Sequence, residues 1–431
     1  MLRGAGATTG GAAYFRKGNP ARRCRPGIPA GGAALETAIR GYCDSRFSRV
    51  ATVFARHFER GEETGAALCV CQGDDIVVDL WAGHADQRAG RRWQRDTPCL
   101  AFSCAKAVTA VSALCLAEAG ACDLDGPVAA WWPEFAAAGK EHTTGAHLLS
   151  HQAGLPAFRD PVSVAEAADP AALAARLAAQ APEWAPGTAH GYHALTFGWL
   201  AGELVRRLSG RTVGEYVAEY IAGPRNLDLW LGAPDEVIGR AARISRGHPA
   251  SARPQASTDP QASTDPRVSM IARASSEAAA DLARRAFGNP DPTSVPGGSN
   301  SPEVLRAGWP ATGLLTTAAA LAGFYRELLA GRIISRAMLR SALAPRAAGP
   351  DKVLGVTTAF SLGFMLPSEA FWVPATARRG AFGHTGLSGA IGLGDIERGL
   401  AIGYVTSRMG SGTAAGTRAA RLVSSVYANA R

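Results

Sequence analysis

The stretch Phe102-Ser103-Cys104-Ala105-Lys106 places a serine and a lysine three positions apart at the start of an apolar segment. Residues three apart in a helix lie on the same face, so we expect the Ser103 hydroxyl and the Lys106 amine to lie within reach of each other. A serine needs a neighbouring base to act as a nucleophile, and a buried lysine with a lowered pKa can be that base, whereas arginine stays protonated. The chain has only four lysines among its 45 basic residues, which makes this lysine informative. Because Ser-x-x-Lys also arises by chance, the tetrad needs support from other segments.

Two further segments supply that support. Tyr192-His193-Ala194 precedes a helix predicted over 196–208, and a phenol beside an ammonium could have its pKa lowered and act as a general base. A lone tyrosine at such a junction is more often a packed aromatic. The segment 383–389 reads Gly-His-Thr-Gly-Leu-Ser-Gly, and its glycines allow the backbone to approach a ligand closely. We expect a strand there to contribute an N–H group to an oxyanion hole.

In this order and at these separations, the three segments resemble the motifs of class C β-lactamases and family VIII carboxylesterases, over about residues 45–430. The run Leu148–Leu155 is also similar to a Leu-Leu-x-His-x-Ser-Gly-Leu segment of that family. The resemblance implies an α+β fold of the β-lactamase/transpeptidase type, with helices and an antiparallel sheet in a sandwich and a helical region beside it. The implied activity needs no metal and no cofactor.

The resemblance also implies roles for individual residues. Ser103 would be the nucleophile, and Lys106 and Tyr192 would share the general acid and base work. The main-chain N–H groups of Ser103 and Leu387 would form the oxyanion hole. The other residues expected at the substrate are His384, Thr385, Gly386 and, from the helical region, Trp309.

The sequence departs from the β-lactamases at two of these motifs. They carry Tyr-x-Asn and Lys-Thr-Gly, but this chain has Ala194 and His384 at those places. Both changes remove groups that recognise the amide and carboxylate of a β-lactam, so we expect weak lactamase activity. The expected function is carboxylesterase-type hydrolysis of ester or thioester substrates through an acyl-Ser103 intermediate.

Three alternatives stay open at this stage. A transacylase or transesterase of natural-product biosynthesis would pass the acyl group from a small-molecule donor to an amine or alcohol acceptor. A non-catalytic penicillin-recognition-type binding protein would be expected to have lost Ser103 or Lys106, and both are present. A penicillin-binding carboxypeptidase would have to be exported.

The periodicity of the apolar residues divides the chain. Residues 1–34 are predicted to be flexible, and 35–431 to form the catalytic domain, with an α/β part over about 35–105 and 335–431 and a helical part over about 106–334. A tandem hexapeptide within 248–266 predicts a disordered insertion. Strands from the two ends of the chain are expected to pair. Helices are expected over 46–60, 103–119, 165–179, 196–208, 213–221 and 414–428, and strands over 66–71, 76–81, 361–366, 383–394 and 400–407.

The composition argues against several classes of partner. The formal charge of +9 comes from scattered arginines, which predicts a solvated surface and no nucleic-acid binding. The eight cysteines lack paired CxxC spacing, and His147 and His151 have no acidic residue between them, so no metal site is expected. No signal-peptide core is visible, and the longest apolar run, 107–117, is shorter than the about 20 residues of a membrane span. We therefore expect a cytoplasmic protein that does not contact a membrane, and the oligomeric state stays open.

Overall fold

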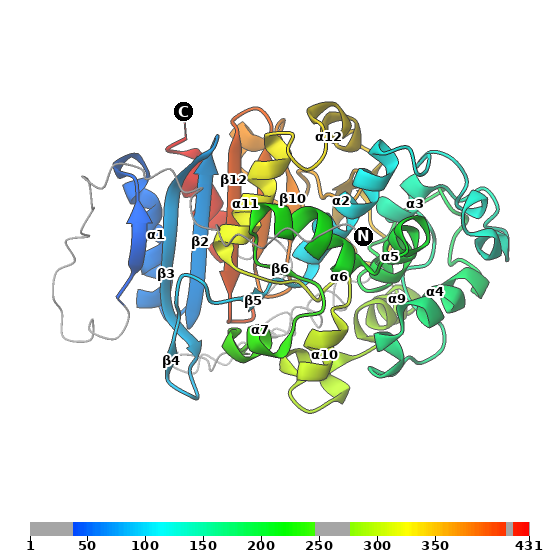
Figure 1. The fold of residues 1–431 in the computed structure, drawn as a ribbon, viewed down its shortest axis with the longest axis horizontal. Coiled ribbons are helices and arrows are strands. Elements are labelled where there is room, and N and C mark those ends of the chain that lie inside the picture. The colour runs from blue at the N-terminus through cyan, green and yellow to red at the C-terminus, as the bar shows by residue number, and fades with distance from the viewer. Residues whose placement is uncertain (1–37, 246–275, 411–416, 431) are drawn as a thin grey trace, which may run out of the picture.

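A computed structural model of the chain describes residues 38–245, 276–410 and 417–430. The predicted flexible segment 1–34 and the predicted insertion 248–266 lie outside these ranges. The described elements form an antiparallel sheet with helices on both faces and a group of further helices to one side (Figure 1). This arrangement is the predicted α+β architecture.

The main sheet joins strands from the two ends of the chain. β2 (Gly65–Gln72) pairs antiparallel with β12 (Leu400–Thr406), and Leu68 lies opposite Tyr404 in that register. The predicted pairing of the two ends is therefore confirmed. The strand order is β1-β3-β2-β12-β11-β10, with β4 paired to β3. The remaining bounds are β1 Arg40–Cys43, β3 Asp75–Asp86, β4 Arg91–Arg92, β10 Ala381–Thr385 and β11 Ile391–Asp395.

The middle of β2 is apolar without interruption because the strand is covered on both faces. Leu68 and Val70 pack in one hydrophobic cluster with helices α1 and α13, whereas Cys69 and Cys71 pack in another with α2 and α11. All four side chains are buried. The bounds of these helices are α1 Ser48–Glu59, α2 Ala105–Glu118, α11 Ala318–Leu329 and α13 Thr417–Tyr427.

Helices of the helical part begin and end at residues that are common helix caps. Asp169 caps α4 by accepting the N–H groups of Ala171 and Ala172, and α5 ends at Gly210, whose φ of 71° suits glycine. The helices are α3 Gly145–Leu149, α4 Pro170–Ala179, α5 Thr196–Ser209, α6 Val213–Tyr216, α7 Asp235–Arg240, α9 Glu277–Gly288, α10 Pro302–Ala307 and α12 Arg336–Ala342. Two small sheets join the segments between the helices, with strands β5 Cys99–Leu100, β6 Leu229–Trp230, β7 Leu315–Thr316, β8 Ala347–Pro350 and β9 Thr357–Phe360.

The structure corrects two of the expected strands. Residues 361–366 form a turn after β9, in which Ser361 donates to the Phe364 carbonyl at 2.9 Å, and only Met365 bridges to Gly383. Glycine is required in this turn because residue 363 packs against α2, where a Cβ would lie 1.9 Å from the Cβ of Ala110, and because its φ is 84°. The segment predicted as one strand over 383–394 is two strands, β10 and β11, with a turn between them.

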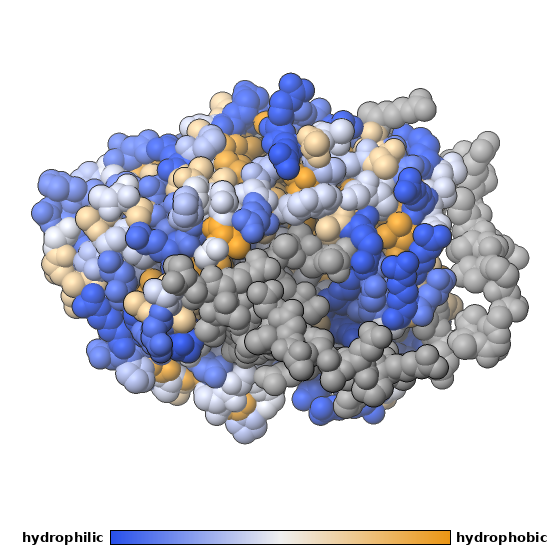
Figure 2. Space-filling view, turned by 180° about the vertical axis from the view of Figure 1, so that it is seen from behind, coloured by the Kyte–Doolittle hydropathy of each residue, from blue (hydrophilic) through white to orange (hydrophobic). Residues whose placement is uncertain are grey.

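The surface hydropathy, the helix lengths and the grouping of possible metal ligands can be compared with the partners that the sequence predicts. Figure 2 shows hydrophilic residues over most of the visible described face, with small hydrophobic groups between them. Of the helices in the described ranges, none has the length and apolar character to cross a membrane. The same ranges hold no group of three or more His, Cys, Asp or Glu side chains placed to bind a metal ion.

Candidate active site

The nucleophile candidate lies at the entrance to a buried helix. Phe102–Cys104 form a single helical turn that leads into α2, and Phe102 has a φ of 48°, a rare value outside glycine. The side chains of α2 from Ala105 to Leu114 are all buried, so this helix is fixed on every side. Lys106 stands one turn after Ser103, and its Nζ lies 3.3 Å from Ser103 Oγ. The predicted contact between the hydroxyl and the amine is present.

Lys106 is completely buried and has no carboxylate partner among the described residues. Its Nζ donates to the carbonyl oxygens of Ala194 at 2.7 Å and Ala311 at 3.1 Å. Burial lowers the pKa of Lys106 well below its usual value, which favours the neutral amine. A neutral amine has two N–H groups and one lone pair. With both N–H groups on carbonyls, such a neutral amine would direct its lone pair towards the Ser103 hydroxyl.

Tyr192 lies beside Ser103 in the wall of the same cavity. The Ser103 side chain interacts with its phenol, and Lys106 Nζ lies 4.7 Å from the centre of its ring. The lowered pKa predicted for Tyr192 is wrong, because burial raises the pKa of this phenol above its usual range. The prediction assumed a neighbouring ammonium, but burial favours the neutral form of Lys106 as well. Tyr192 is therefore a neutral hydroxyl that can donate or relay a proton.

The end of β10 brings the His-Thr-Gly segment to the serine. Gly386 approaches Ala101 so closely that a Cβ would lie 2.2 Å from the Ala101 carbonyl oxygen, and Leu387 follows directly. Cys104 Sγ donates to the His384 carbonyl at 3.4 Å and ties the serine turn to the strand. Glycine at 386 thus lets the two main-chain segments predicted to form the oxyanion hole meet.

His384 has one available ring nitrogen. Its Nδ1 lies 2.8 Å from the Thr385 carbonyl oxygen and therefore carries the proton, whereas its buried Nε2 has no partner among the described residues. Burial lowers the pKa of His384 to about 3. At neutral pH the ring is uncharged, so it does not supply the positive charge that a lysine would place here.

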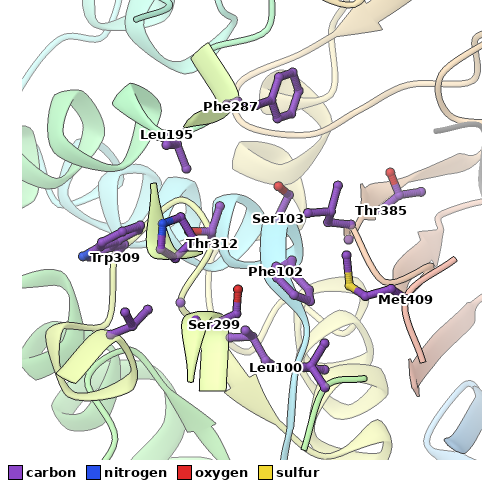
Figure 3. Close-up of a pocket in the computed structure, with 18 of the residues that line it drawn as sticks. Leu100, Phe102, Ser103, Leu195, Phe287, Ser299, Trp309, Thr312, Thr385 and Met409 are labelled. Atoms are coloured by element: carbon purple, nitrogen blue, oxygen red, sulfur yellow. The ribbon is translucent and has the colours of Figure 1, made fainter. Parts of the chain in front are cut away.

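These residues surround one cavity of about 430 Å³. Figure 3 shows Ser103 with Trp309 and Leu195 on one side and Thr385 and Met409 on the other. None of the described lining residues is Asp, Glu, Lys or Arg. Because His384 is neutral, the described wall of the cavity carries no formal charge. The arrangement suits an uncharged, largely apolar group beside the serine hydroxyl.

Seven of the eight predicted site residues line this cavity, and Lys106 lies against Ser103 as the eighth. Sequence reasoning missed much of the wall, which comes from loops distant in the chain and includes Leu100, Phe102, Phe287, Asn300, Leu354, Val356 and Met409. It also missed Asp351, a buried carboxylate that accepts a hydrogen bond from the main-chain N–H of Tyr192. The Asp-Lys-Val-Leu-Gly run at 351–355 is a turn signal, but a turn signal does not identify a contact 159 residues away.

Known proteins are similar to this chain over most of its length. A family model described as beta-lactamase matches residues 50–426. The esterase/beta-lactamase LipL of Mycobacterium tuberculosis (strain ATCC 25618 / H37Rv) is 32% identical over 384 residues, which cover 86% of this chain and 83% of that protein. A crystal structure of a family VIII carboxylesterase has a TM-score of 0.78 at 32% identity and covers 91% of this chain and 100% of the other. A penicillin-binding protein homologue from Caulobacter crescentus has the same TM-score and coverage at 35% identity. The similarity therefore extends over both the sheet and the helical part.

Proposed function

The chain belongs to the beta-lactamase family, and from that premise we propose that it is a serine esterase that works through an acyl-Ser103 intermediate. One observation carries the proposal: the Ser103 hydroxyl lies 3.3 Å from the amine of a buried Lys106 and beside the phenol of Tyr192, at the wall of a cavity without described charges. A nucleophile, a base and a relay are the groups that acyl transfer requires. Carboxylesterase and esterase/beta-lactamase names among the relatives agree with this reaction class.

Acylation begins with the transfer of the Ser103 proton to the Lys106 lone pair. Ser103 Oγ bonds to the carbonyl carbon of the ester, and the carbonyl oxygen takes up negative charge. The main-chain N–H groups of Ser103 and Leu387 donate to that oxygen. When the bond from carbon to the leaving oxygen breaks, the proton returns from Lys106 through the Tyr192 hydroxyl to the departing alkoxide. Charge and protons balance within the site.

Deacylation reverses these steps with a new nucleophile. Water gives the free acid, and an alcohol or amine gives the transacylation product that is the second candidate function. The apolar wall favours this second candidate, because it disfavours ordered water beside the acyl group. Product analysis with and without a short alcohol separates the two outcomes. Only free acid at high alcohol concentration would eliminate the transacylase.

The same cavity sets the expected substrate preference. A β-lactam carboxylate would meet neutral His384 and a described wall without a cation, so its charge would lose water without gaining a partner. A simple ester avoids this cost. We expect ester hydrolysis to exceed hydrolysis of a chromogenic cephalosporin by at least about 100-fold in kcat/KM, since a site that cannot pair a substrate's polar group discriminates strongly. Equal rates would contradict the preference.

The intermediate is tested by trapping it. Brief incubation with a p-nitrophenyl ester, acid quench and intact-protein mass spectrometry should show one acyl group on the wild-type protein and none on Ser103→Ala. Ser388→Ala is the matched control, because Ser388 is a buried serine beside the site, in the turn between β10 and β11, and its Oγ has no partner among the described residues. The control should still acylate. Acylation of Ser103→Ala at the wild-type rate would reject the proposal.

A further inference from the structure

We propose that Asp351 is a positioning residue for acyl transfer, which acts by holding the main chain of Tyr192 so that the phenol hydroxyl stays on Ser103. The inference rests on the proposed function and assigns a role outside the residues that touch the substrate. Asp351 is a buried carboxylate that does not line the cavity. Among the described residues, its hydrogen bonds reach the site through Tyr192 and through the turn that follows Asp351.

The Asp351 carboxylate accepts four hydrogen bonds. Its Oδ1 accepts the main-chain N–H groups of Tyr192 at 3.0 Å and of Val353 and Leu354 at 2.8 Å each. Its Oδ2 accepts the Thr358 hydroxyl at 3.1 Å. One oxygen therefore joins the general acid and base residue to a turn that is distant in the sequence.

A second link supports the same connection. The Thr358 hydroxyl uses its one O–H group in the hydrogen bond to Asp351. Thr358 Oγ1 therefore accepts a hydrogen bond from His190 Nε2, at 2.8 Å. The main chain of Lys352 also donates to the His190 carbonyl at 3.2 Å. Between them Gly191 packs on the turn, where a Cβ would lie 3.1 Å from Val353 Cγ2. The segment 190–192 is thus docked on the segment 351–358.

The carboxylate is the one acceptor for the Tyr192 N–H among the described residues. The ring of Tyr192 has other neighbours, with centroids 4.9 Å from His151 and 6.1 Å from Phe360, but ring contacts are non-directional and allow small shifts. A buried N–H group without an acceptor costs free energy. Loss of the carboxylate should therefore favour a shift of the Tyr192 main chain towards another acceptor. A movement of the hydroxyl away from Ser103 would slow both acylation and deacylation.

Main-chain hydrogen bonds that do not involve the carboxylate also hold the turn after Asp351. Asp351 N–H donates to the Val356 carbonyl at 3.0 Å, and Gly355 N–H donates to the Asp351 carbonyl at 3.1 Å. Val356, which lines the cavity, is therefore held by a main-chain bond that survives a change of the Asp351 side chain, whereas the N–H groups of Val353 and Leu354 lose the carboxylate as their acceptor. Because Val356 keeps its main-chain bond, loss of the carboxylate should lower kcat by more than it changes KM.

The test compares Asp351→Ala with Asp351→Asn and with Asp395→Ala. The asparagine keeps an oxygen that can accept the Tyr192 N–H. Asp395 is the matched control: it is buried, its Oδ1 accepts the N–H groups of Glu397 and Arg398 in a turn, and its Oδ2 accepts the Tyr427 hydroxyl. It differs from Asp351 in lacking a bond to Tyr192. Measurements are kcat and KM for a p-nitrophenyl ester per folded molecule, and the rate at which a fluorophosphonate labels Ser103.

We expect Asp351→Ala to lower kcat and the labelling rate by about 10- to 100-fold, the range for a small misplacement of a catalytic group. Asp351→Asn should stay within about threefold of wild type, since a hydrogen-bond acceptor is retained. Asp395→Ala should change the melting temperature but not kcat. If Asp351→Ala does not fold, Asp351→Leu fills the space without an acceptor and takes its place.

Equal kcat values for the alanine variants at 351 and 395 would overturn the inference, as would an asparagine variant as slow as the alanine variant. Failure of the proposed function is distinguishable from these results. In that case the wild-type protein itself would form no acyl adduct at Ser103, and Ser103→Ala would not differ from it.

Discussion

An ammonium group at Lys106 would find two carbonyl oxygens and one hydroxyl, but no described carboxylate, in surroundings buried from bulk solvent. Removing a charge from water without a partner is costly, and the group responds by losing its proton. The cost of burying the charged form lowers the pKa of Lys106, and the lowered pKa is what allows this lysine to act as a base. Ser103 gains a proton acceptor because Lys106 is placed where its charged form is unstable.

This view predicts that a permanent charge cannot replace Lys106. Lys106→Arg should lower kcat/KM by at least about 100-fold, as should Lys106→Ala, since general base catalysis contributes that much and a guanidinium does not deprotonate at neutral pH. Lys352→Arg, at an exposed lysine, is the control and should keep full activity. Activity of Lys106→Arg near that of wild type would show that Lys106 acts by its charge and not as a base.

The pKa of Lys106 also predicts how stability depends on pH. The unfolded chain binds a proton at Lys106 up to its usual pKa of 10.5, whereas the folded chain loses it well below that value. Between these two pKa values the unfolded state holds one more proton, so the Lys106 contribution to the free energy of unfolding rises with pH, by about 1.4 kcal/mol per pH unit. Lys106→Met should lack this slope.

Urea unfolding at several pH values between 7 and 9 measures the difference between the two slopes. Ser103→Ala should keep the wild-type slope because serine does not titrate there. The carbonyls of Ala194 and Ala311 lose a donor in Lys106→Met, but that cost is independent of pH. Parallel curves for wild type and Lys106→Met would mean that Lys106 stays protonated in the folded protein.

At the scale of the elements, the site depends on how closely β10 approaches the turn before α2. A Cβ at Gly386 would overlap the main-chain carbonyl of Ala101, and a carbonyl oxygen cannot move aside as a flexible side chain can. The strand end and the serine turn must separate if residue 386 is larger. The two N–H groups proposed for the oxyanion hole belong to these two segments.

Gly386→Ala should therefore impair catalysis more than folding. We expect kcat to fall by about 100-fold, comparable to the loss of one oxyanion donor, while the apolar cavity still binds ester with a similar KM. Gly239→Ala is the control, because Gly239 lies in α7 with nothing within 4 Å of an added Cβ, and it should leave kcat unchanged. A Gly386→Ala variant with wild-type kcat would show that the close approach is not needed for catalysis.

The sequence predicted elements well where a local pattern determined them. The helix that follows Ser103 and carries Lys106, and the paired strands β2 and β12, follow from the apolar pattern. The motifs identified six residues that line one cavity, and Trp309, expected from the helical region, is a seventh. Sequence reasoning failed at 361–366, where Gly363 closes a turn because of contact with Ala110, a residue far away in the chain. It also failed on the pKa of Tyr192 and on Asp351. These depend on burial and on distant contacts, which no local pattern records.

At the scale of the whole molecule, the two ends of the chain are joined by a buried ion pair as well as by the sheet. Arg418 of α13 lies 2.8 Å from Glu63, which precedes β2, and the exposed fractions of the two side chains are 7% and 0%. Glu63 also bonds to Tyr404 and to Thr406 of β12. The same arginine donates to the Ser388 carbonyl at 2.9 Å, in the turn beside the proposed oxyanion strand. Arg418 of α13 therefore connects the sheet, through Glu63, with the turn beside the proposed oxyanion strand, through the Ser388 carbonyl.

Loss of one partner should destabilise the protein far more than loss of both charges. Arg418→Met leaves the Glu63 carboxylate buried and unpaired, which should lower the free energy of unfolding by about 3–5 kcal/mol, and adding Glu63→Gln should recover part of it because a neutral amide needs no counter-charge. The control is Arg306→Met, at an exposed pair with Asp235 that has the same 2.8 Å distance; it should cost at most about 1 kcal/mol. Urea unfolding of the four proteins measures these differences. If Arg418→Met and Arg306→Met lost the same stability, the buried pair would not be what holds the two ends of the chain together, and pairing of β2 with β12 would suffice.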